Sequence, residues 1–524
     1  SDMLERGYER LEGKYRAILG FALNHRKIVL SIAVIIFVLS LSLTKFIGKE
    51  FTPSEDQSRF IIRLQTPVDY SIEEVDRMCR RVEGILRKVP EVTTVLYSQG
   101  GGATRELNKA NMMINLKPKS ERKKHQEQIK AEIRRSLRAV PGLRASVENA
   151  SMIGGGQRQT AIQYSIRGLD LQELETYTRD IVKQFSKLPG VVDLDTSLET
   201  GKPEVRVFID RDKAADLGVD IKSVAETVNF LIGGEADVTK FKDEGKGRRY
   251  DVRARLTPGG RMSPDDIGKV YVRAKDGRLV QLANITTFQE GGGSSIINRV
   301  DRQRAVTVFA NLEGTPLGKA KDELDSVSAN VLPSGYSGRY KGQADVMAES
   351  FGYLMFAMML GIIMAYMVLA AQFESFVHPF TVLLSMPFSF IGAFGALLIF
   401  GKTLNIFSFI GLILLMGLVK KNAILLVDYT NVLRARGMSR RDAILQAGPV
   451  RLRPILMTTF AMIMGMMPIA IGIGEGAETR SPMALATIGG LLTSLLLTLV
   501  AVPVAYDLFD ELQGKLFRKA AGSR

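Results

Sequence analysis

The chain has 524 residues, which is enough for several domains, and hydrophobic residues make up 46% of it. Its formal net charge of +15 does not indicate nucleic-acid binding, because much of the excess of Lys and Arg lies beside long apolar segments. The single cysteine, Cys79, excludes an internal disulfide and is expected to be a small buried side chain. Together these properties favour a membrane protein.

In chain order, the first predicted element is a helix within residues 1–27. Its apolar residues recur at spacings of three and four, and Lys and Arg occupy the other face. The apolar positions are Tyr8, Leu11, Tyr15, Ile18, Leu19 and Ala22. This pattern predicts an amphipathic helix that lies in the inner membrane interface. The alternative is a helix packed against a neighbour that this chain lacks.

Six apolar segments have the length at which a helix crosses a bilayer, and a helix satisfies its own backbone polar groups there. The predicted spans are Ile28–Phe46, Tyr353–Ala371, Pro379–Phe400, Ile406–Tyr429, Pro454–Ile473 and Ala484–Leu508. A polar block of about 300 residues, from about Ile47 to Met347, separates the first span from the other five. Such an insertion is typical of proteins that move or sense something across a membrane.

The arginines predict the orientation of the spans. The basic flank His25-Arg26-Lys27 stays in the cytoplasm, so the first span runs outward and the polar block is external. The loop from Asn431 to Arg453 then lies inside and carries six arginines, in agreement with the same orientation. Both termini are expected in the cytoplasm, including a tail over residues 511–524.

One pattern repeats along the external block. A strand is followed by an amphipathic helix that ends at an apolar residue and Pro, and the next strand begins after a turn. Strands are expected at Phe60–Thr66, Asn111–Leu116, Ala161–Arg167 and Ala305–Leu312. Two such βαβ units make a ferredoxin-like sandwich. We therefore predict one sandwich over residues 47–157 and a second over 158–232 and 300–346. An insertion over 233–299 interrupts the second and begins with a polar segment that is too long for a tight hairpin.

Four motifs resemble one known family along essentially the whole chain. They are Phe51-Thr-Pro-Ser-Glu-Asp56, Val300-Asp-Arg-Gln-Arg304, Gly417-Leu-Val-Lys-Lys-Asn-Ala-Ile-Leu-Leu-Val-Asp428 and Arg451-Leu-Arg-Pro-Ile-Leu-Met-Thr458. With these motifs the chain resembles the C-terminal half of a resistance–nodulation–division (RND) efflux pump of the hydrophobe/amphiphile branch. Members of that family have twelve spans in two halves, whereas this chain has six. The acidic pair that takes up protons belongs to the half that this sequence lacks.

The resemblance implies a multi-pass α-helical membrane protein of six spans. It carries an α+β periplasmic region of two ferredoxin-like porter subdomains, and residues 233–299 form a docking insertion. The first span covers 28–46 and the other five lie within 347–510. The implied location is the bacterial inner membrane. The implied partners are an N-terminal half or a second half-length chain, in a homo- or hetero-oligomer of trimeric symmetry, together with membrane lipid, a periplasmic adaptor and an outer-membrane channel. The proton-motive force replaces any cofactor.

Charged residues inside a span are costly, so they are candidate functional residues. Lys421 matches the relay lysine of the family, and Arg451 and Thr458 match other relay positions. Asp428 is the one nearby acid, about 10 Å from Lys421 along a helix, on the same face but too far for a direct ion pair. The alternatives are that Lys421 and its neighbour Lys420 extend toward the membrane surface, and that Arg451 is a positive-inside anchor.

Two glycine-containing segments are further candidates. The segment around Gln99, Gly100, Gly101, Gly102 and Thr104 corresponds to the family's switch loop along the substrate path, although a plain flexible connector would look the same. It holds no aromatic residue for stacking on drugs. A second segment begins at Gly233 and Gly234 and resembles the docking arm that reaches a neighbouring protomer.

We conclude from the sequence that the chain is half of a proton-driven inner-membrane transporter, a secondary antiporter rather than an enzyme. It would export hydrophobic or amphiphilic compounds through a tripartite assembly and contribute to multidrug resistance. One alternative is a non-transporting scaffold or assembly subunit. Others are a protein-exporting or lipid-transporting RND branch, and a heavy-metal (copper) efflux branch, because 21 methionines supply soft thioether ligands. The three histidines are scattered and predict no metal site.

Overall fold

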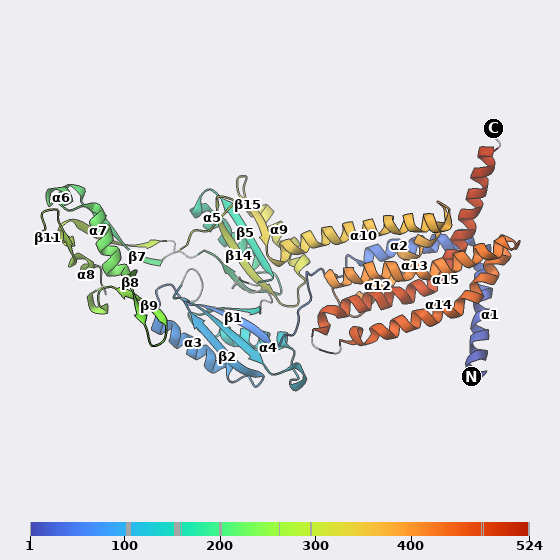
Figure 1. Ribbon diagram of the computed structural model, residues 1–524, viewed down its shortest axis with the longest axis horizontal. Coiled ribbons are helices and arrows are strands. Elements are labelled where there is room, and N and C mark those ends of the chain that lie inside the picture. The colour runs from blue at the N-terminus through green and yellow to red at the C-terminus, as the bar shows by residue number, and fades with distance from the viewer. Residues whose placement is uncertain are drawn as a thin grey trace. The chain divides into compact units, whose positions relative to one another are not determined.

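A computed structural model describes residues 2–100, 106–150, 158, 160–198, 202–260, 263–293, 296–472, 474 and 476–521. The chain divides into two compact units. The first comprises Ser1–Thr66, Ser71–Ser197 and Asn298–Arg524, and the second comprises Pro67–Tyr70 and Leu198–Ile297. The first unit contains the membrane helices and two α+β layers, which Figure 1 shows as separate groups of elements.

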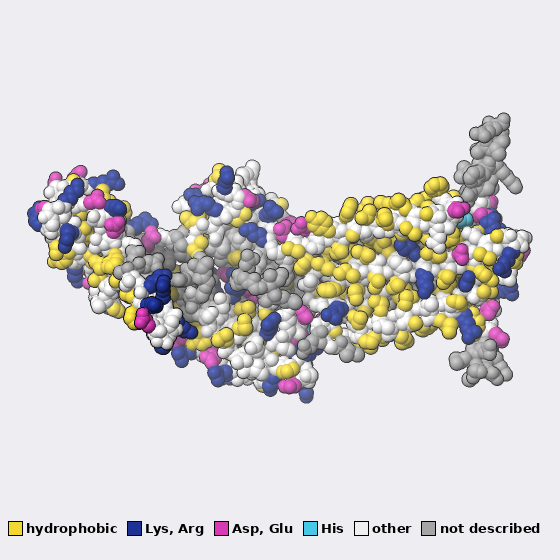
Figure 2. Space-filling model, viewed as in Figure 1, with side chains coloured by type: hydrophobic (Ala, Val, Ile, Leu, Met, Phe, Trp, Pro, Cys, Tyr) yellow, Lys and Arg dark blue, Asp and Glu magenta, His cyan; other side chains and the backbone are white. Residues whose placement is uncertain are grey.

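The described residues contain six helical segments long and apolar enough to cross a membrane, which confirms the number predicted from the sequence. In Figure 1 they run alongside one another. They are α2 (Arg26–Leu43), α10 (Gln343–Phe373), α11 with α12 (His378–Leu383 and Ser385–Ile399), α13 (Ile406–Ala435), α14 (Arg440–Ile471) and α15 (Ala477–Ala521). Several extend beyond the predicted spans, because polar turns continue the helix outside the apolar stretch. Apolar side chains cover the visible face of this bundle (Figure 2).

Small residues allow two of these helices to pack closely. A Cβ atom added to Gly392 of α12 would lie 2.1 Å from the carbonyl oxygen of Gly489 in α15, and one added to Gly489 would lie 2.3 Å from that of Gly392. Without a large hydrophobic driving force between helices in lipid, such close backbone approach is a main source of association. Glycines therefore fix the contact between α12 and α15.

Helix α1 (Asp2–Asn24) packs against α14 and α15 of the same chain. Tyr15 and Leu19 are buried in the apolar cluster they share, and the Tyr15 hydroxyl donates to the carbonyl oxygen of Leu499 at 2.8 Å. Leu11 and Ile18 stay exposed, at 47% and 53%. Part of the predicted apolar stripe, including Tyr15 and Leu19, is therefore packed on the bundle, and another part, including Leu11 and Ile18, is exposed.

The first α+β layer follows α2. Its elements are β1 (Arg59–Gln65), α3 (Ile72–Leu86), β2 (Val92–Gln99), β3 (Lys109–Leu116), α4 (Gln126–Arg138) and β4 (Arg144–Asn149), with a short 3₁₀ turn at Lys119–Glu121. The sheet order is β2-β3-β1-β4, and all neighbours are antiparallel. Alternate residues of β1 face the helices and are fully buried, as their period of two requires. Cys79 lies on the buried face of α3, as predicted.

The second α+β layer has the same strand order. Its elements are β5 (Ile162–Gly168), α5 (Leu171–Phe185), β6 (Val191–Thr196), β13 (Arg299–Val300), β14 (Gln303–Leu312), α9 (Leu317–Val331) and β15 (Ser337–Lys341). Antiparallel pairs give β6-β14-β5-β15, with β13 beside the start of β14. Helix α10 begins directly after β15, so this layer continues into the membrane bundle.

Buried ion pairs join the two α+β layers. Arg134 of α4 donates from Nε to both carboxylate oxygens of Asp193 in β6, at 2.8 and 3.0 Å. Asn311 of β14 and the backbone N–H of Val147 donate to the same carboxylate. The side chains of Arg134 and Asp193 are only 7% and 2% exposed. The contact between the layers therefore has a buried charged centre.

The second compact unit begins at Leu198, earlier than the insertion predicted at residue 233. The reason is that β7 (Lys202–Ile209) pairs along its length with β12 (Thr286–Gly293). Between them lie α6 (Arg211–Asp216), α7 (Ile221–Val228), a π-helical turn (Asn229–Gly234), β8 (Glu235–Asp243), β9 (Arg248–Ala254), a 3₁₀ turn (Pro258–Gly260), α8 (Pro264–Gly268), β10 (Tyr271–Arg273), β11 (Leu279–Gln281) and a 3₁₀ turn (Leu282–Asn284). A small core of valines, leucines and isoleucines supports the unit.

Residues 233–247, which were predicted to be too long for a tight hairpin, contain the first strand and the turn of a hairpin. Strands β8 and β9 pair antiparallel, with Phe241 opposite Tyr250 and a short turn that ends at Gly247. Gly247 has a φ of 62°, which glycine adopts without strain. Both aromatic side chains of this pair are largely exposed, at 62% and 44%.

Candidate functional site

The candidate relay residues occupy α13 and α14, which form a helical hairpin in the bundle. Helix α13 begins at Asn405, whose side chain accepts from the backbone N–H of Ser408 at 3.0 Å. This N-cap fixes where the helix starts. Lys421 and Asp428 both follow on the exposed side of α13, while Lys420 is half-buried.

An exposed stripe runs along α13 and contains both charged residues. Its members recur at spacings of three, four and seven, which place them on one face of a helix. They are Ile410, Leu414, Gly417, Lys421, Asp428 and Val432. Among the described residues, no ion pair involves Lys421 or Asp428, in agreement with the separation predicted from their spacing. The chain thus leaves a charged face of a membrane helix uncovered.

Arg451 and Thr458 lie on α14 and are both half-buried. The Arg451 guanidinium lies 4.4 Å from the centre of the Tyr429 ring on α13, which is a cation–π contact. Its Nε is buried and has no hydrogen-bond partner among the described protein atoms. The Thr458 hydroxyl donates to the carbonyl oxygen of Ile455 at 3.2 Å. The structure therefore brings Arg451 next to the residue that follows Asp428, whereas it shows no contact between Thr458 and Lys421.

Sequence reasoning missed two residues beside these positions. Asn422 follows Lys421 and is 2% exposed, and Thr459 follows Thr458 and is 0% exposed. Among the described protein atoms neither side chain has a hydrogen-bond partner. A polar residue surrounded by apolar ones inside a span was the available signal for both.

Arg26 and Arg434 of the bundle form ion pairs, whereas no ion pair of Arg451 is found among the described residues. Arg26 of α2 lies 2.8 Å from Asp507 and 2.7 Å from Glu511, and Arg434 of α13 lies 2.8 Å from Asp510. These carboxylates all belong to α15, so ion pairs connect three helices at one end of the bundle. Charged side chains gather at this end in Figure 2.

The switch-loop residues are divided by the limits of the described chain. Gly101, Gly102 and Thr104 lie outside the described residues. Gln99 ends β2 and its side-chain amide donates to the carbonyl oxygen of Ile72 at 2.9 Å. Gly100 has a φ of 61° and its N–H bonds to the carbonyl oxygen of Lys109. The hydrogen bonds of Gln99 and Gly100 therefore fix where the connection between β2 and β3 begins.

The two glycines of the predicted docking arm close the π-helical turn before β8. The Arg253 side chain donates to the carbonyl oxygen of Gly233 at 2.9 Å and to that of Gly234 at 3.2 Å. Gly234 has a φ of 81°, so a side chain there would be strained. These glycines position the base of the β8–β9 hairpin.

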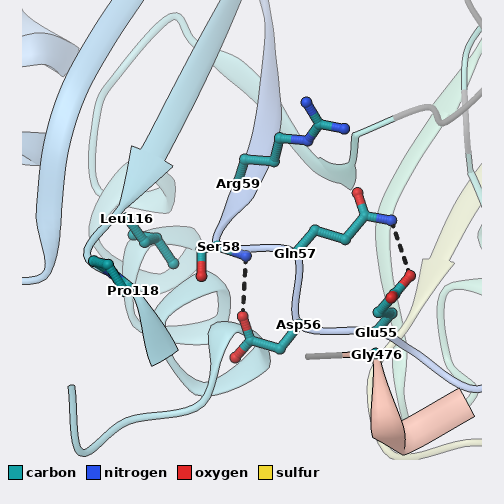
Figure 3. Close-up of a pocket in the computed structure, with 8 residues that line it drawn as sticks. All are labelled: Glu55, Asp56, Gln57, Ser58, Arg59, Leu116, Pro118 and Gly476. Atoms are coloured by element: carbon teal, nitrogen blue, oxygen red, sulfur yellow. Dashed lines mark hydrogen bonds between the residues drawn. The ribbon is translucent and has the colours of Figure 1, made fainter. Parts of the chain in front are cut away.

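A pocket of about 480 Å³ lies near the start of β1 and Gly476 (Figure 3). The Asp56 carboxylate beside it accepts from Arg122 and from the backbone N–H of Ser58 and Gln126. Burial alone would raise the pKa of Asp56, but the hydrogen bond from Arg122 and those from the two N–H groups outweigh it and lower this pKa. Asp56 thus acts as a structural anchor at the base of the first α+β layer.

No group of three His, Cys, Asp or Glu residues that could hold a metal ion occurs in the described part of the chain. Met112 is buried and Met113 is 42% exposed, on opposite faces of β3, and Met457 and Met464 of α14 are 62% and 59% exposed.

A bundle of membrane helices with charged groups inside its spans, joined to a large α+β region, defines the class of membrane transport proteins. The chain belongs to the AcrB/AcrD/AcrF family, whose model matches residues 2–510. This finding confirms the RND efflux family predicted from the motifs.

Individual relatives agree with this assignment. The multidrug resistance protein MdtC of Cronobacter sakazakii is 30% identical over 515 residues, which cover 97% of this chain and 50% of that protein. MdtC of Pectobacterium carotovorum is 31% identical over 511 residues, which cover 97% and 49%. The chain spans about half the length of the curated relatives it matches. A solved heavy metal efflux pump, at 26% identity, superposes with a TM-score of 0.85 over 96% of this chain and 52% of that one.

Proposed function

We propose that the chain acts as the C-terminal half of a proton-driven efflux transporter of the inner membrane, which exports hydrophobic or amphiphilic compounds. The observation that carries this proposal is the open face of α13, where Lys421 and Asp428 are exposed inside a predicted span. A charged side chain at the centre of a bilayer costs about 2.5–3.5 kcal/mol on insertion scales. A second helical unit that supplies an acidic partner would remove that cost.

In this proposal the partner is an N-terminal RND half or a second half-length chain, and one of its carboxylates pairs with Lys421. The fixed ammonium lowers the pKa of a neighbouring carboxylate. When the carboxylate takes up a proton, the attraction to Lys421 disappears and the helices can shift. Arg451 stands on the adjacent helix as a second fixed cation. The proton-motive force drives the cycle, and no cofactor takes part.

We further propose that the two α+β layers are ferredoxin-like porter subdomains in the periplasm and that the second compact unit is the docking insertion. The shared strand order of the two layers supports the first assignment. The exposed β8–β9 hairpin suits contact with a neighbouring protomer. The working assembly would be a trimer with a periplasmic adaptor and an outer-membrane channel.

Heavy-metal export is the second candidate, since a heavy metal efflux pump superposes closely on this chain. Export of a soft metal ion would require converging thioether or thiolate ligands along the path. Growth assays with copper salts and with lipophilic dyes, in cells that contain both halves, separate the two substrate classes.

The experiment that tests the proposal is dye export from proteoliposomes under an imposed pH gradient. Vesicles with this chain alone should not export the dye, because Lys421 has no acidic partner among the residues that the structure describes. Vesicles that also contain an N-terminal half should export it only while the gradient persists. Gradient-driven export by the chain alone would contradict the proposal. A stable complex of both halves without export would instead favour the scaffold function.

A further inference from the structure

Asn422 is an unusual residue for the interior of a helix bundle. It is 2% exposed, and neither its amide nitrogen nor its amide oxygen has a hydrogen-bond partner among the described protein atoms. A buried amide without hydrogen bonds costs about 1–3 kcal/mol by mutational data. A helix in lipid has no bulk water to reduce this cost. Its surroundings therefore have to supply polar partners.

Thr459 of α14 presents the same problem. Hydroxyl groups on helices usually bond to their own backbone one turn earlier. The Thr430 hydroxyl donates to the carbonyl oxygen of Leu426 at 2.8 Å, and the Thr458 hydroxyl does so to that of Ile455. The Thr459 hydroxyl is fully buried and makes no such bond to any described protein atom.

Asn422 and Thr459 lie at the same level of the α13–α14 hairpin. On one side, Ala423 of α13 and Ile455 of α14 share an apolar cluster. On the other side, Val419 of α13 and Ile463 of α14 share a different cluster. In the sequence, Asn422 falls between Val419 and Ala423, and Thr459 falls between Ile455 and Ile463. The boundary between the two apolar clusters is therefore polar on both helices.

Helix α15 contributes two more polar residues at this level. Two hydrogen bonds connect α13 with α15 and show how the two helices are aligned. One joins Thr487 to Gly411, which are 76 residues apart, and the other joins Tyr506 to Asn431, which are 75 residues apart. The same offset places Asn422 level with residue 497 of α15. Ser494 and Thr498 flank that position, are 0% and 1% exposed, and bond to each other at 3.0 Å.

We propose that Asn422, Thr459, Ser494 and Thr498 form a water-binding layer inside the bundle. Buried waters in proteins typically make about three hydrogen bonds to polar groups that otherwise lack partners. The amide of Asn422 offers donors and acceptors, and the Thr459 hydroxyl offers one donor and an acceptor. The layer holds water whether or not the transport proposal is correct. Asn422 directly follows Lys421 in the sequence. The water of this layer therefore hydrates the interior of the bundle at the depth at which Lys421 is exposed on α13.

Cysteine accessibility tests the layer without measuring transport. Cys79 is first replaced by Ala, and Thr459→Cys and Thr498→Cys are introduced separately. The matched controls are Ile455→Cys and Val502→Cys, which are 0% exposed on the same two helices. Membranes that contain the full chain are treated with 2-aminoethyl methanethiosulfonate, and the modified fraction is followed by mass spectrometry. A thiol reacts as its thiolate, which forms far less readily in apolar surroundings than where water solvates the charge.

The layer positions should react at least about tenfold faster than the two controls, since apolar burial suppresses thiolate formation. Asn422→Leu in the Thr459→Cys background should return the reaction rate to the control level. The conservative change Ile424→Leu on the same helix should leave it fast. Equal rates at all four cysteines would overturn the proposal. So would an unchanged rate after Asn422→Leu in a chain that still elutes as a single folded species.

Discussion

Replacing Asp193 by Ala removes the centre of the contact between the two α+β layers. The change deletes both hydrogen bonds from Arg134, at 2.8 and 3.0 Å, and those from Asn311 and from the backbone N–H of Val147. The Arg134 side chain is 7% exposed, so its charge stays buried after the change. Its other carboxylate partner, Glu313, is 49% exposed and compensates little.

The expected cost follows from burial. Breaking a buried ion pair by removing one partner destabilises a protein by about 3–5 kcal/mol, because an unpaired charge remains inside. For a region of about 150–250 residues, each kcal/mol shifts the unfolding temperature by roughly 2–4 °C. Asp193→Ala should therefore lower the unfolding temperature of the α+β region by roughly 6 °C or more.

Cys79 provides the assay, since it is the one thiol of the chain and is buried on α3. A fluorogenic maleimide reacts with it when heating opens the first α+β layer. Arg87→Ala serves as the control, because its pair with Glu83 is a solvent-exposed helix pair worth less than about 1 kcal/mol. If Asp193→Ala shifts the transition no more than Arg87→Ala does, the layers are not held by this buried pair.

Two further predictions concern pH and helix packing. The pKa of Asp56 is lowered in the folded chain. The ionised Asp56 carboxylate therefore stabilises the fold fully above its unfolded pKa of about 3.9, and this contribution is lost as the pH falls through its folded pKa. The difference in unfolding temperature between the chain and Asp56→Asn, measured by circular dichroism, should therefore narrow below about pH 4, and a constant difference would be inconsistent with the Arg122 interaction. Gly392→Ala should lower the unfolding temperature in detergent, because its Cβ would meet the Gly489 carbonyl at 2.1 Å, whereas Gly395→Ala, with nothing within 4 Å of its Cβ, should not. Equal effects of the two alanines would refute the close α12–α15 contact.

The spans and the α+β pattern could be predicted because each depends on a local signal. An apolar run of suitable length must form a helix in lipid, and residues such as Ile62 and Leu64 alternate with polar ones in the strand they form. The predicted ends of the membrane helices were less accurate. Helix α14 begins at Arg440 and continues through Pro449 and Pro454, where the sequence favoured a start at Pro454. Neighbouring helices can satisfy the backbone groups that proline frees.

The hairpin depends on residues close together in the sequence, whereas the proposed polar layer depends on residues far apart in it. The pairing of Phe241 with Tyr250 could have been inferred from alternating residues around Gly245 and Gly247. The layer proposed around Asn422 is different, because its other members lie on α14 and α15. Only the register of the three helices brings those residues to one level.

Transport by variants of Lys421 tests the central claim most directly. The chain is reconstituted with an N-terminal half, and dye export under a pH gradient is compared for the unchanged chain, Lys421→Ala and Lys420→Ala. The two lysines are adjacent, but Lys421 lies on the open face of α13 and Lys420 is half-buried beside it. Lys421→Ala should abolish export at normal protein levels, and Lys420→Ala should retain it. Full export by Lys421→Ala would contradict the account.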